Sequence, residues 1–389
     1  MSFEITFLGA SGGPVEGITC SMLLKSSNVS YNEILSNNLP NELICVDAGS
    51  GVGLLSELIY NELQNVSPQS KQLRMYNDML SLEQCFKTKV TRPFAGLSAS
   101  VSPYEQSQEI FKLMNNYLIS HAHMDHIAAL VINSAGFCKE SPKNVYGSKG
   151  TIDTLQRHVF NGLVWPNMSK FNMVKLSSHE YWQTFSMNDT YSVTIFDLSH
   201  GKMVPPDENT SQRPESPNYT RHTYDDNFEN YNNYISSAFL VTHELSNSSV
   251  LIFGDFESDT VSKLGKNKRI WCKIAPMLLH PEKQLKGIIL ECSTCQIVST
   301  NELYGHIMPT HLINELRVLN DEILALIPSS NRHNMAPLAG FNVVINHVKE
   351  APNLSDPRRE ILSELEILNH KYELGIHFSV ALNGASIVL

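Results

Sequence analysis

Four residues able to bind a metal ion lie within six consecutive positions of this chain: His121, His123, Asp125 and His126. An apolar, strand-like run ends just before them, and an apolar, helix-like run begins just after. His121 and His123 are two positions apart as the chain leaves the strand, so they can point the same way and bind one cation. Asp125 and His126 can then face a second cation. A solvated loop that happens to be rich in histidine is the weaker interpretation.

Three further ligand-type residues each follow an apolar, strand-like run: His200, Asp255 and His347. In α/β proteins, functional groups gather at the carboxyl ends of strands. Chance would seldom distribute such residues over the rest of the chain in this way. We therefore expect all three to converge on the segment 121–126.

The remaining pattern predicts one mixed α/β domain over residues 1–389. A strand over 3–8 is followed by a glycine-rich turn at 9–14, and helices are expected at 54–63 and 358–372. The last expected strand, 378–382, closes the chain. Two stretches rich in Asn, Ser or Pro, near 26–41 and 203–233, read as surface insertions, the second being a lid or a disordered segment.

Composition narrows the class of partner. Apolar residues make up 42% of the chain, enough for a substantial core, and the formal net charge is −10. Both polynucleotides and anionic membranes need a basic footprint, so we expect neither as a partner. No apolar run is long enough to span a bilayer, no signal peptide is visible, and seven scattered cysteines do not suggest a disulfide framework. We expect a cytoplasmic protein and allow for a homodimer.

The glycine turn, the His-x-His-x-Asp-His segment and the later His, Asp and His together resemble the metallo-β-lactamase superfamily. The resemblance extends from residue 3 to about residue 382. It implies an α/β fold, the four-layer αβ/βα sandwich. It also implies that one metal ion is held by His121, His123 and His200, the other by Asp125, His126 and His347, with Asp255 bridging the two.

A narrower resemblance concerns residues 121–135, which look like the signature of the class II 3′,5′-cyclic-nucleotide phosphodiesterases, a family that includes fungal low-affinity cAMP phosphodiesterases. Residues 303–309 and 346–349 are also similar to that family. Met124 stands where the signature usually has Leu, and Ala129 where it has Gly or Ser; neither is a ligand position. The resemblance implies hydrolysis of cAMP, and of cGMP as a further candidate, to the nucleoside 5′-monophosphate.

The expected chemistry is a two-metal phosphodiester hydrolysis. Two divalent ions about 3.5–4 Å apart can share a hydroxide and stabilise both the attacking and the leaving oxygen. Imidazole and carboxylate donors suit Zn²⁺, with Mn²⁺ or Fe²⁺ as alternatives. Two such ions, offset by two carboxylates and one hydroxide, leave a charge of roughly +1 that attracts an anionic substrate. Asp125 is taken as a catalytic residue as well as a ligand.

Expulsion of the ribose 3′ oxygen requires an acid. By resemblance to the phosphodiesterases of the superfamily, His306 is the candidate for that acid. His311 competes for this role because it is close in sequence, and a surface histidine without a role is the other interpretation. Glu291, at the end of a strand-like run, could orient His306.

Two other functions remain open at this point. The first keeps the metal site but acts on RNA, as do the tRNA 3′-processing endonucleases of the same superfamily; the charge of −10 and the lack of a basic arm disfavour it. The second is a metal-stabilised scaffold that binds partners through 203–233. The pair Cys292 and Cys295 has the spacing of a redox or zinc site, but no second pair accompanies it, so two packed thiols are expected.

Overall fold

The computed structural model describes residues 2–68, 75–202, 233–280, 284–295, 303–332, 335–352 and 355–389. Within these residues the strands form two sheets. The order in the eight-stranded sheet is β4 (Lys89–Thr91), β15 (Ser386–Val388), β1 (Phe3–Gly9), β2 (Ser21–Ser26), β3 (Ile44–Ala48), β5 (Asn116–Leu118), β6 (Lys143–Ser148), β7 (Val174–His179). The order in the seven-stranded sheet is β14 (His377–Val380), β13 (Asn342–Asn346), β12 (Leu285–Glu291), β11 (Ser248–Phe253), β10 (Asn233–His243), β9 (Tyr191–Lys202), β8 (Thr184–Ser186).

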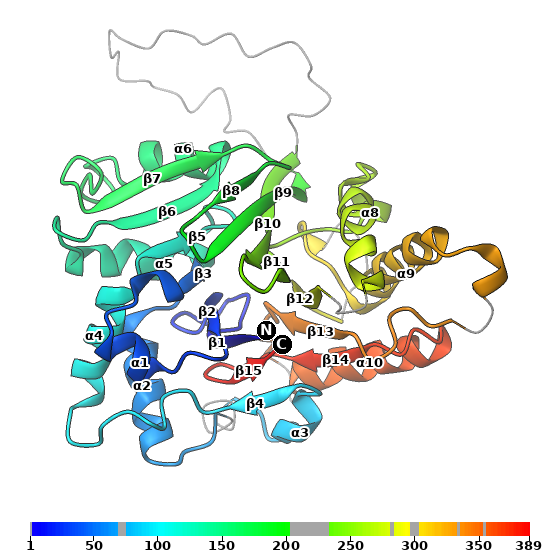
Figure 1. The fold of residues 1–389 in the computed structure, drawn as a ribbon, viewed down its shortest axis with the longest axis horizontal. Helices are drawn as coiled ribbons and strands as arrows, with labels where there is room; N and C mark the ends of the chain where they lie inside the picture. The colour runs from blue at the N-terminus through cyan, green and yellow to red at the C-terminus, as the bar shows by residue number, and fades with distance from the viewer. Residues whose placement is uncertain are drawn as a thin grey trace, which may run out of the picture.

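The helices of the described residues are α1 (Tyr31–Ser36), α2 (Val52–Leu63), α3 (Leu82–Cys85), α4 (Pro103–Leu113), α5 (Met124–Asn133), α6 (Lys149–Thr154), α7 (Asp259–Ser262), α8 (Lys266–Leu279), α9 (Pro309–Leu326) and α10 (Pro357–Lys371). Helices α1, α2, α4 and α5 lie on the side of the first sheet, and α8, α9 and α10 lie on the side of the second (Figure 1).

Two apolar clusters hold these layers together. One joins the facing strands of the two sheets to α8–α10, with Phe7, Ile195 and Trp271 among its buried members. The other joins the outer face of the first sheet to α2, α4 and α5, with Leu55 and Ile110 among its members. Because inner strands such as β11 and β12 are buried on both faces, they read as apolar runs. The predicted αβ/βα sandwich is confirmed.

Parallel pairing brings the ends of several strands to one edge. Strands β3, β5, β6 and β7 run parallel in the first sheet, as do β11, β12, β13 and β14 in the second. Parallel neighbours end at the same edge of a sheet, where their connecting loops meet. The residues that follow β3, β5, β11, β12 and β13 are therefore candidates for one shared site.

The sequence signals for the last helix are confirmed in detail. Asp356 is the N-cap of α10 and accepts a hydrogen bond from the backbone N–H of Arg358, while Pro357 occupies the first turn. Such a cap satisfies a backbone donor that the helix cannot pair, and proline there loses no hydrogen bond. This is why the helix begins where the Asp-Pro pair predicted.

Three expectations differ from the structure. The chain does not close on β14: β15 follows and pairs with β1 and β4 in the other sheet, and its three residues are too few to show an alternating pattern. His200 lies inside β9 rather than after a strand, because pairing with β10 continues to Lys202. The stretch 26–41 contains α1, whose Tyr31 and Ile34 are buried.

The proposed insertion at 203–233 lies, apart from Asn233, outside the described residues. Asn233 is the first residue of β10. None of the helices in the described ranges combines the length and apolar character required to cross a bilayer.

Candidate metal centre

The structure brings all seven residues predicted as metal ligands into one centre, in which five are buried, Asp125 is half-buried and His123 is exposed. The chain leaves β5, passes through His121, and enters α5 with His123 at the N-cap position. Asp125 and His126 then lie in the first turn of α5. His200 comes from β9, and Asp255 and His347 follow β11 and β13.

One group of donors is formed by three imidazoles. A nitrogen from each of His121, His123 and His200 lies within 4.8 Å of the other two. Nε2 of His121 is 3.0 Å from Nδ1 of His123, and that same Nδ1 is 3.3 Å from Nε2 of His200. Three imidazole nitrogens around one point are the donors that a catalytic zinc ion commonly takes from a protein.

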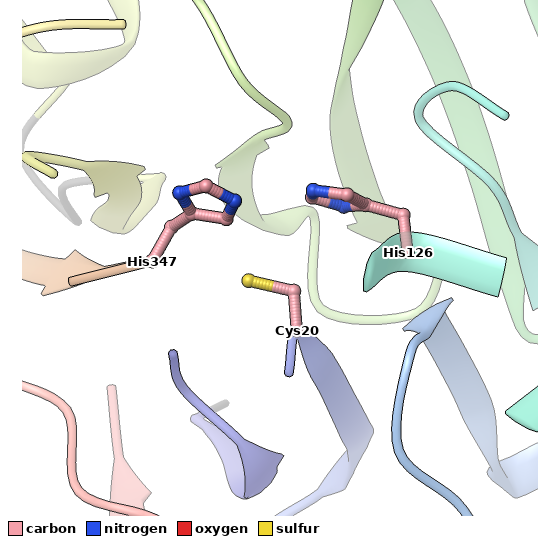
Figure 2. A group of neighbouring side chains, drawn as sticks. All are labelled: Cys20, His126 and His347. Atoms are coloured by element: carbon pink, nitrogen blue, oxygen red, sulfur yellow. The ribbon is translucent and has the colours of Figure 1, made fainter. Parts of the chain in front are cut away.

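The second group combines carboxylates with imidazoles: Asp125, His126, Asp255 and His347. Nε2 of His347 is 3.3 Å from Oδ2 of Asp125. The rings of His126 and His347 approach each other from α5 and from the end of β13 (Figure 2). Nε2 of His126 is buried without a hydrogen bond of good geometry. A buried imidazole nitrogen without a hydrogen-bond partner, next to two carboxylates, is suited to bind a divalent cation.

Asp255 lies between the two groups. Its Oδ1 is 3.2 Å from Nε2 of both His126 and His347. Its Oδ2 is 3.6 Å from Nε2 of His200 and 3.9 Å from Nε2 of His121. Each oxygen of one buried carboxylate therefore faces a different group of donors, which is the placement that a bridging ligand requires.

Residues behind the centre fix the orientation of its imidazoles. Nδ1 of His126 donates to Oδ2 of Asp47 at 2.8 Å, and Nδ1 of His200 donates to the carbonyl oxygen of Gly305 at 2.8 Å. With a proton on Nδ1, each ring directs the lone pair of Nε2 into the centre. Asp47 also accepts hydrogen bonds from the backbone N–H and the hydroxyl of Ser120, just before His121.

Asp47 was not among the predicted site residues. Its sequence context did carry a signal, because it ends the apolar run of β3 as Asp255 and His347 end theirs. The backbone of Asp47 has φ +53°. Non-glycine residues seldom adopt this region, and such strain is concentrated at functional sites.

The surroundings of His121, His123 and Asp125 favour the protonation states that bind a metal ion: neutral imidazole and ionised carboxylate. Burial lowers the pKa of His121 well below its usual value and brings that of His123 to about 4. Neutral imidazole is the form that binds a metal ion. Burial acts against ionisation of Asp125, but the hydrogen bond with His347 and the charges of nearby histidines bring its pKa to about 2.

His126 behaves in the opposite way. Burial alone would lower its pKa, but the carboxylates of Asp255 and Asp47 raise it well above its usual value. The two carboxylates next to His126 therefore favour a positive charge at this position. A divalent cation supplies that charge and lets the imidazole act as a neutral donor.

His306 lies beside the centre, next to Glu291 as predicted. Its Nδ1 is 3.0 Å from Oε2 of Glu291 and 3.7 Å from Oδ2 of Asp255. Burial and the charge of Asp255 raise the pKa of Glu291 to about 7, while burial lowers the pKa of His306 to about 4. The carboxyl group of Glu291 therefore keeps its proton to a higher pH than an exposed glutamate does. His311, the competing candidate, lies in α9 and belongs to none of the donor clusters among the described residues.

The glycine turn after β1 lies against His347. A Cβ on Gly12 would overlap the ring of His347, so only glycine allows this approach. Next to it, the hydroxyl of Ser11 donates to Oε1 of Glu350 at 2.7 Å, and Glu350 forms a buried ion pair with Arg358 of α10. Helix α10 thus stabilises the loop that carries His347.

Tyr234 is a second residue that the sequence did not identify. Its ring stacks on His123 with centroids 4.5 Å apart and planes 14° apart. It lies at the start of β10, and no motif or spacing distinguishes it from neighbouring tyrosines in the sequence. Only the pairing of β10 with β9 brings it over the centre.

Replacement of Asp47 by Asn tests the support behind His126. We expect the affinity for metal ions and the rate of the metal-dependent reaction to fall by about 10- to 100-fold, because the amide no longer fixes the Nδ1 proton. Zinc titration and the rate of hydrolysis measure the two effects.

Asp197→Asn is the matched control for that substitution, since Asp197 is also buried but bonds Trp182 and Lys266. A similar loss in the control would attribute the effect to folding instead.

Comparison with known proteins identifies relatives along the whole chain. Residues 33–384 match the family model described as cAMP phosphodiesterases class-II. A 3′,5′-cyclic-nucleotide phosphodiesterase of Candida albicans is 42% identical, with 100% of each chain covered. A 3′,5′-cyclic-nucleotide phosphodiesterase 1 of Saccharomyces cerevisiae is 30% identical over 100% of this chain and 99% of its own.

Solved structures agree with this relationship. The crystal structure of unliganded yeast PDE1 superposes with a TM-score of 0.77 at 28% sequence identity, covering 100% of this chain and 99% of that one. The metallo-beta-lactamase fold protein YhfI from Bacillus subtilis gives a TM-score of 0.50 at 12% identity, with 100% of both chains covered. The second likeness concerns the fold alone.

Proposed function

The chain belongs to the class-II cAMP phosphodiesterase family, and from this premise we propose that it hydrolyses a 3′,5′-cyclic nucleotide to the 5′-monophosphate with divalent cations at the centre described above. The observation that carries the proposal is the position of Asp255, whose two oxygens each face one group of donors. A single-cation site would not need a shared carboxylate between two donor groups.

Each cation has its own donors. His121, His123 and His200 would hold one, and Asp125, His126 and His347 the other, with Asp255 shared. Imidazole and carboxylate donors fit Zn²⁺ best, and Mn²⁺ or Fe²⁺ are the alternatives. When bound, the cations supply Lewis acidity toward the phosphoryl oxygens and lower the pKa of water.

The protein itself supplies the proton for the leaving group. When Glu291 is protonated, its carboxyl group can donate to Nδ1 of His306, which then carries the proton of the neutral imidazole on Nε2. Transfer of that Nε2 proton to the 3′ oxygen of the ribose would be matched by transfer of the Glu291 proton to Nδ1. His306 thus acts as the general acid, and Glu291 positions it and replaces its proton.

A small anionic substrate agrees with the charge of the molecule better than a polynucleotide does. The chain carries a net charge of −10, whereas binding of RNA depends on many basic contacts with phosphates. The family relationship also favours the cyclic nucleotide over the tRNA precursor considered above. A cytoplasmic location and assembly as a homodimer stay predictions.

A direct assay tests the function. Purified protein incubated with millimolar cAMP is expected to produce 5′-AMP, with cGMP as the comparison substrate. Failure to turn over either cyclic nucleotide in the presence of added zinc would reject the proposal. A salt-sensitive gel shift with tRNA would instead favour the RNA-processing alternative.

His306→Gln is expected to lower kcat by about 100-fold or more with a smaller change in KM, because general acid catalysis acts in the transition state. Steady-state kinetics with cAMP measure both constants. His311→Gln is the matched control, because it changes a nearby histidine that is outside the centre. Equal losses in both variants would remove His306 from the mechanism.

A further inference from the structure

A cysteine thiol lies beneath the second group of donors. Cys20 directly precedes β2, and its Sγ lies within 4.8 Å of one nitrogen from each of His126 and His347, which are equally close to each other. Figure 2 shows the thiol directed between the two imidazole rings, which reach toward each other from opposite sides. Three ligand atoms on three separate elements thus surround one point.

The backbone holds this thiol in place. The carbonyl oxygen of Cys20 accepts a hydrogen bond from the N–H of Gly49 at 2.8 Å, and only 2% of the residue is exposed. Strand β2 pairs with β3 immediately afterwards, from Ser21 to Ala48. The backbone of Cys20 is therefore held by the first sheet, and its short, buried side chain places the sulfur at a defined point.

The environment of the sulfur is unusual for an inert buried thiol. Nδ2 of Asn346 donates a hydrogen bond to Sγ at 3.6 Å, so the sulfur acts as an acceptor. Burial raises the pKa of Cys20 well above its usual value, and the charges of Asp255 and Asp47 raise it further. A cation at this point would reverse that balance, because a coordinating thiol is deprotonated outright.

The other cysteines provide a contrast. All seven cysteines are free, and Cys20 is the one that joins a cluster of ligand-type residues within the described part of the chain. Cys45 is equally buried, on the neighbouring strand β3, yet it belongs to no such cluster. Burial in the first sheet alone therefore does not place a thiol among histidines.

We propose that Sγ of Cys20 is an additional donor to the cation held by Asp125, His126 and His347. On binding, the S–H bond breaks, a sulfur–metal bond forms, and the proton passes to solvent. The inference rests on the proposed function only in requiring that a cation binds there. A thiolate is a soft donor, so Cys20 biases this position toward Zn²⁺ over Mn²⁺, which prefers oxygen ligands.

Cobalt(II) tests the proposal without relying on activity. The full-length protein, stripped of metal and loaded with two equivalents of Co²⁺, is expected to show thiolate-to-cobalt charge-transfer absorption in the near ultraviolet. Cys20→Ser is expected to lose that absorption while keeping the visible bands of cobalt bound to histidine and carboxylate. Cys45→Ser, the matched control, is expected to keep both.

Absence of the charge-transfer absorption in the fully loaded wild type, or its persistence in Cys20→Ser, would overturn the proposal. If Cys20→Ser does not fold, cadmium-113 spectra of the wild type decide. One of the two resonances is expected at the low field that sulfur ligation produces, and two resonances in the nitrogen and oxygen range would contradict it. Hydrolysis of cAMP by the same samples is scored separately, so a wild type that is active without the sulfur signal rejects Cys20 alone.

Discussion

Asp255→Asn is expected to lower kcat/KM for cAMP by about a thousandfold or more. Loss of a residue that merely supports a ligand already costs about 10- to 100-fold, and Asp255 is placed to be a ligand of both cations. Its Oδ1 lies 3.2 Å from Nε2 of His126, and its Oδ2 lies 3.6 Å from Nε2 of His200. An amide offers one oxygen and no negative charge. Steady-state kinetics and metal analysis of the purified variant measure the effect.

Glu315→Gln is the matched control for this change. Glu315 is also a buried carboxyl group, but it accepts hydrogen bonds from Trp271 and from the backbone N–H of Asp259, away from the centre. We expect the control to retain its metal and nearly all its activity. Equal activity of the wild type and Asp255→Asn would favour the scaffold function over catalysis.

Removal of divalent cations with a chelator is expected to reduce hydrolysis of cAMP to background, a loss of several orders of magnitude. Without a cation, His126 is placed between the carboxylates of Asp47 and Asp255 and takes up the positive charge that these groups demand. A protonated imidazole cannot act as a metal ligand, and a divalent cation is the group that would lower the pKa of water toward neutrality here. Rates before and after dialysis against the chelator measure the loss.

Restoration distinguishes metal loss from damage. Added Zn²⁺ is expected to return the activity, and Mn²⁺ or Fe²⁺ to return it in part. The same chelator saturated with zinc beforehand is the control, and it is expected to leave the rate unchanged. Full activity in protein from which metal analysis detects no divalent ion would contradict the two-metal chemistry.

The local part of the centre was predictable because it is continuous in the sequence. His121, His123 and Asp125 lie within five consecutive positions, between the end of a strand and the first turn of a helix. Their proximity therefore does not depend on how the rest of the chain folds. The cap of α10 was predictable for the same reason. Asp356 and Pro357 act on backbone groups only one or two residues away.

Residues that act across the sheets were harder to predict. Asp47 and Tyr234 reach His126 and His123 only through strand pairing, β3 with β5 and β10 with β9. The number of residues between the members of each pair does not indicate that they are close in space. Strand β15 was missed because a three-residue strand has no period, and its place between β1 and β4 is decided by the sheet.

The sequence by itself determined the donor types, their order along the chain and the mixed α/β class, since apolar runs and strand-end residues are local properties, while the four-layer sandwich was implied by the family resemblance. Only the tertiary structure decided that each oxygen of Asp255 faces a different group of donors, that Asp47 supports His126, and that Cys20 lies beneath His126 and His347. The physical reason is that parallel pairing within each sheet and packing between the two sheets set the positions of strand ends. Both depend on contacts between residues that are far apart in the sequence, such as Ile44 with Asn116 and Ile288 with Val343.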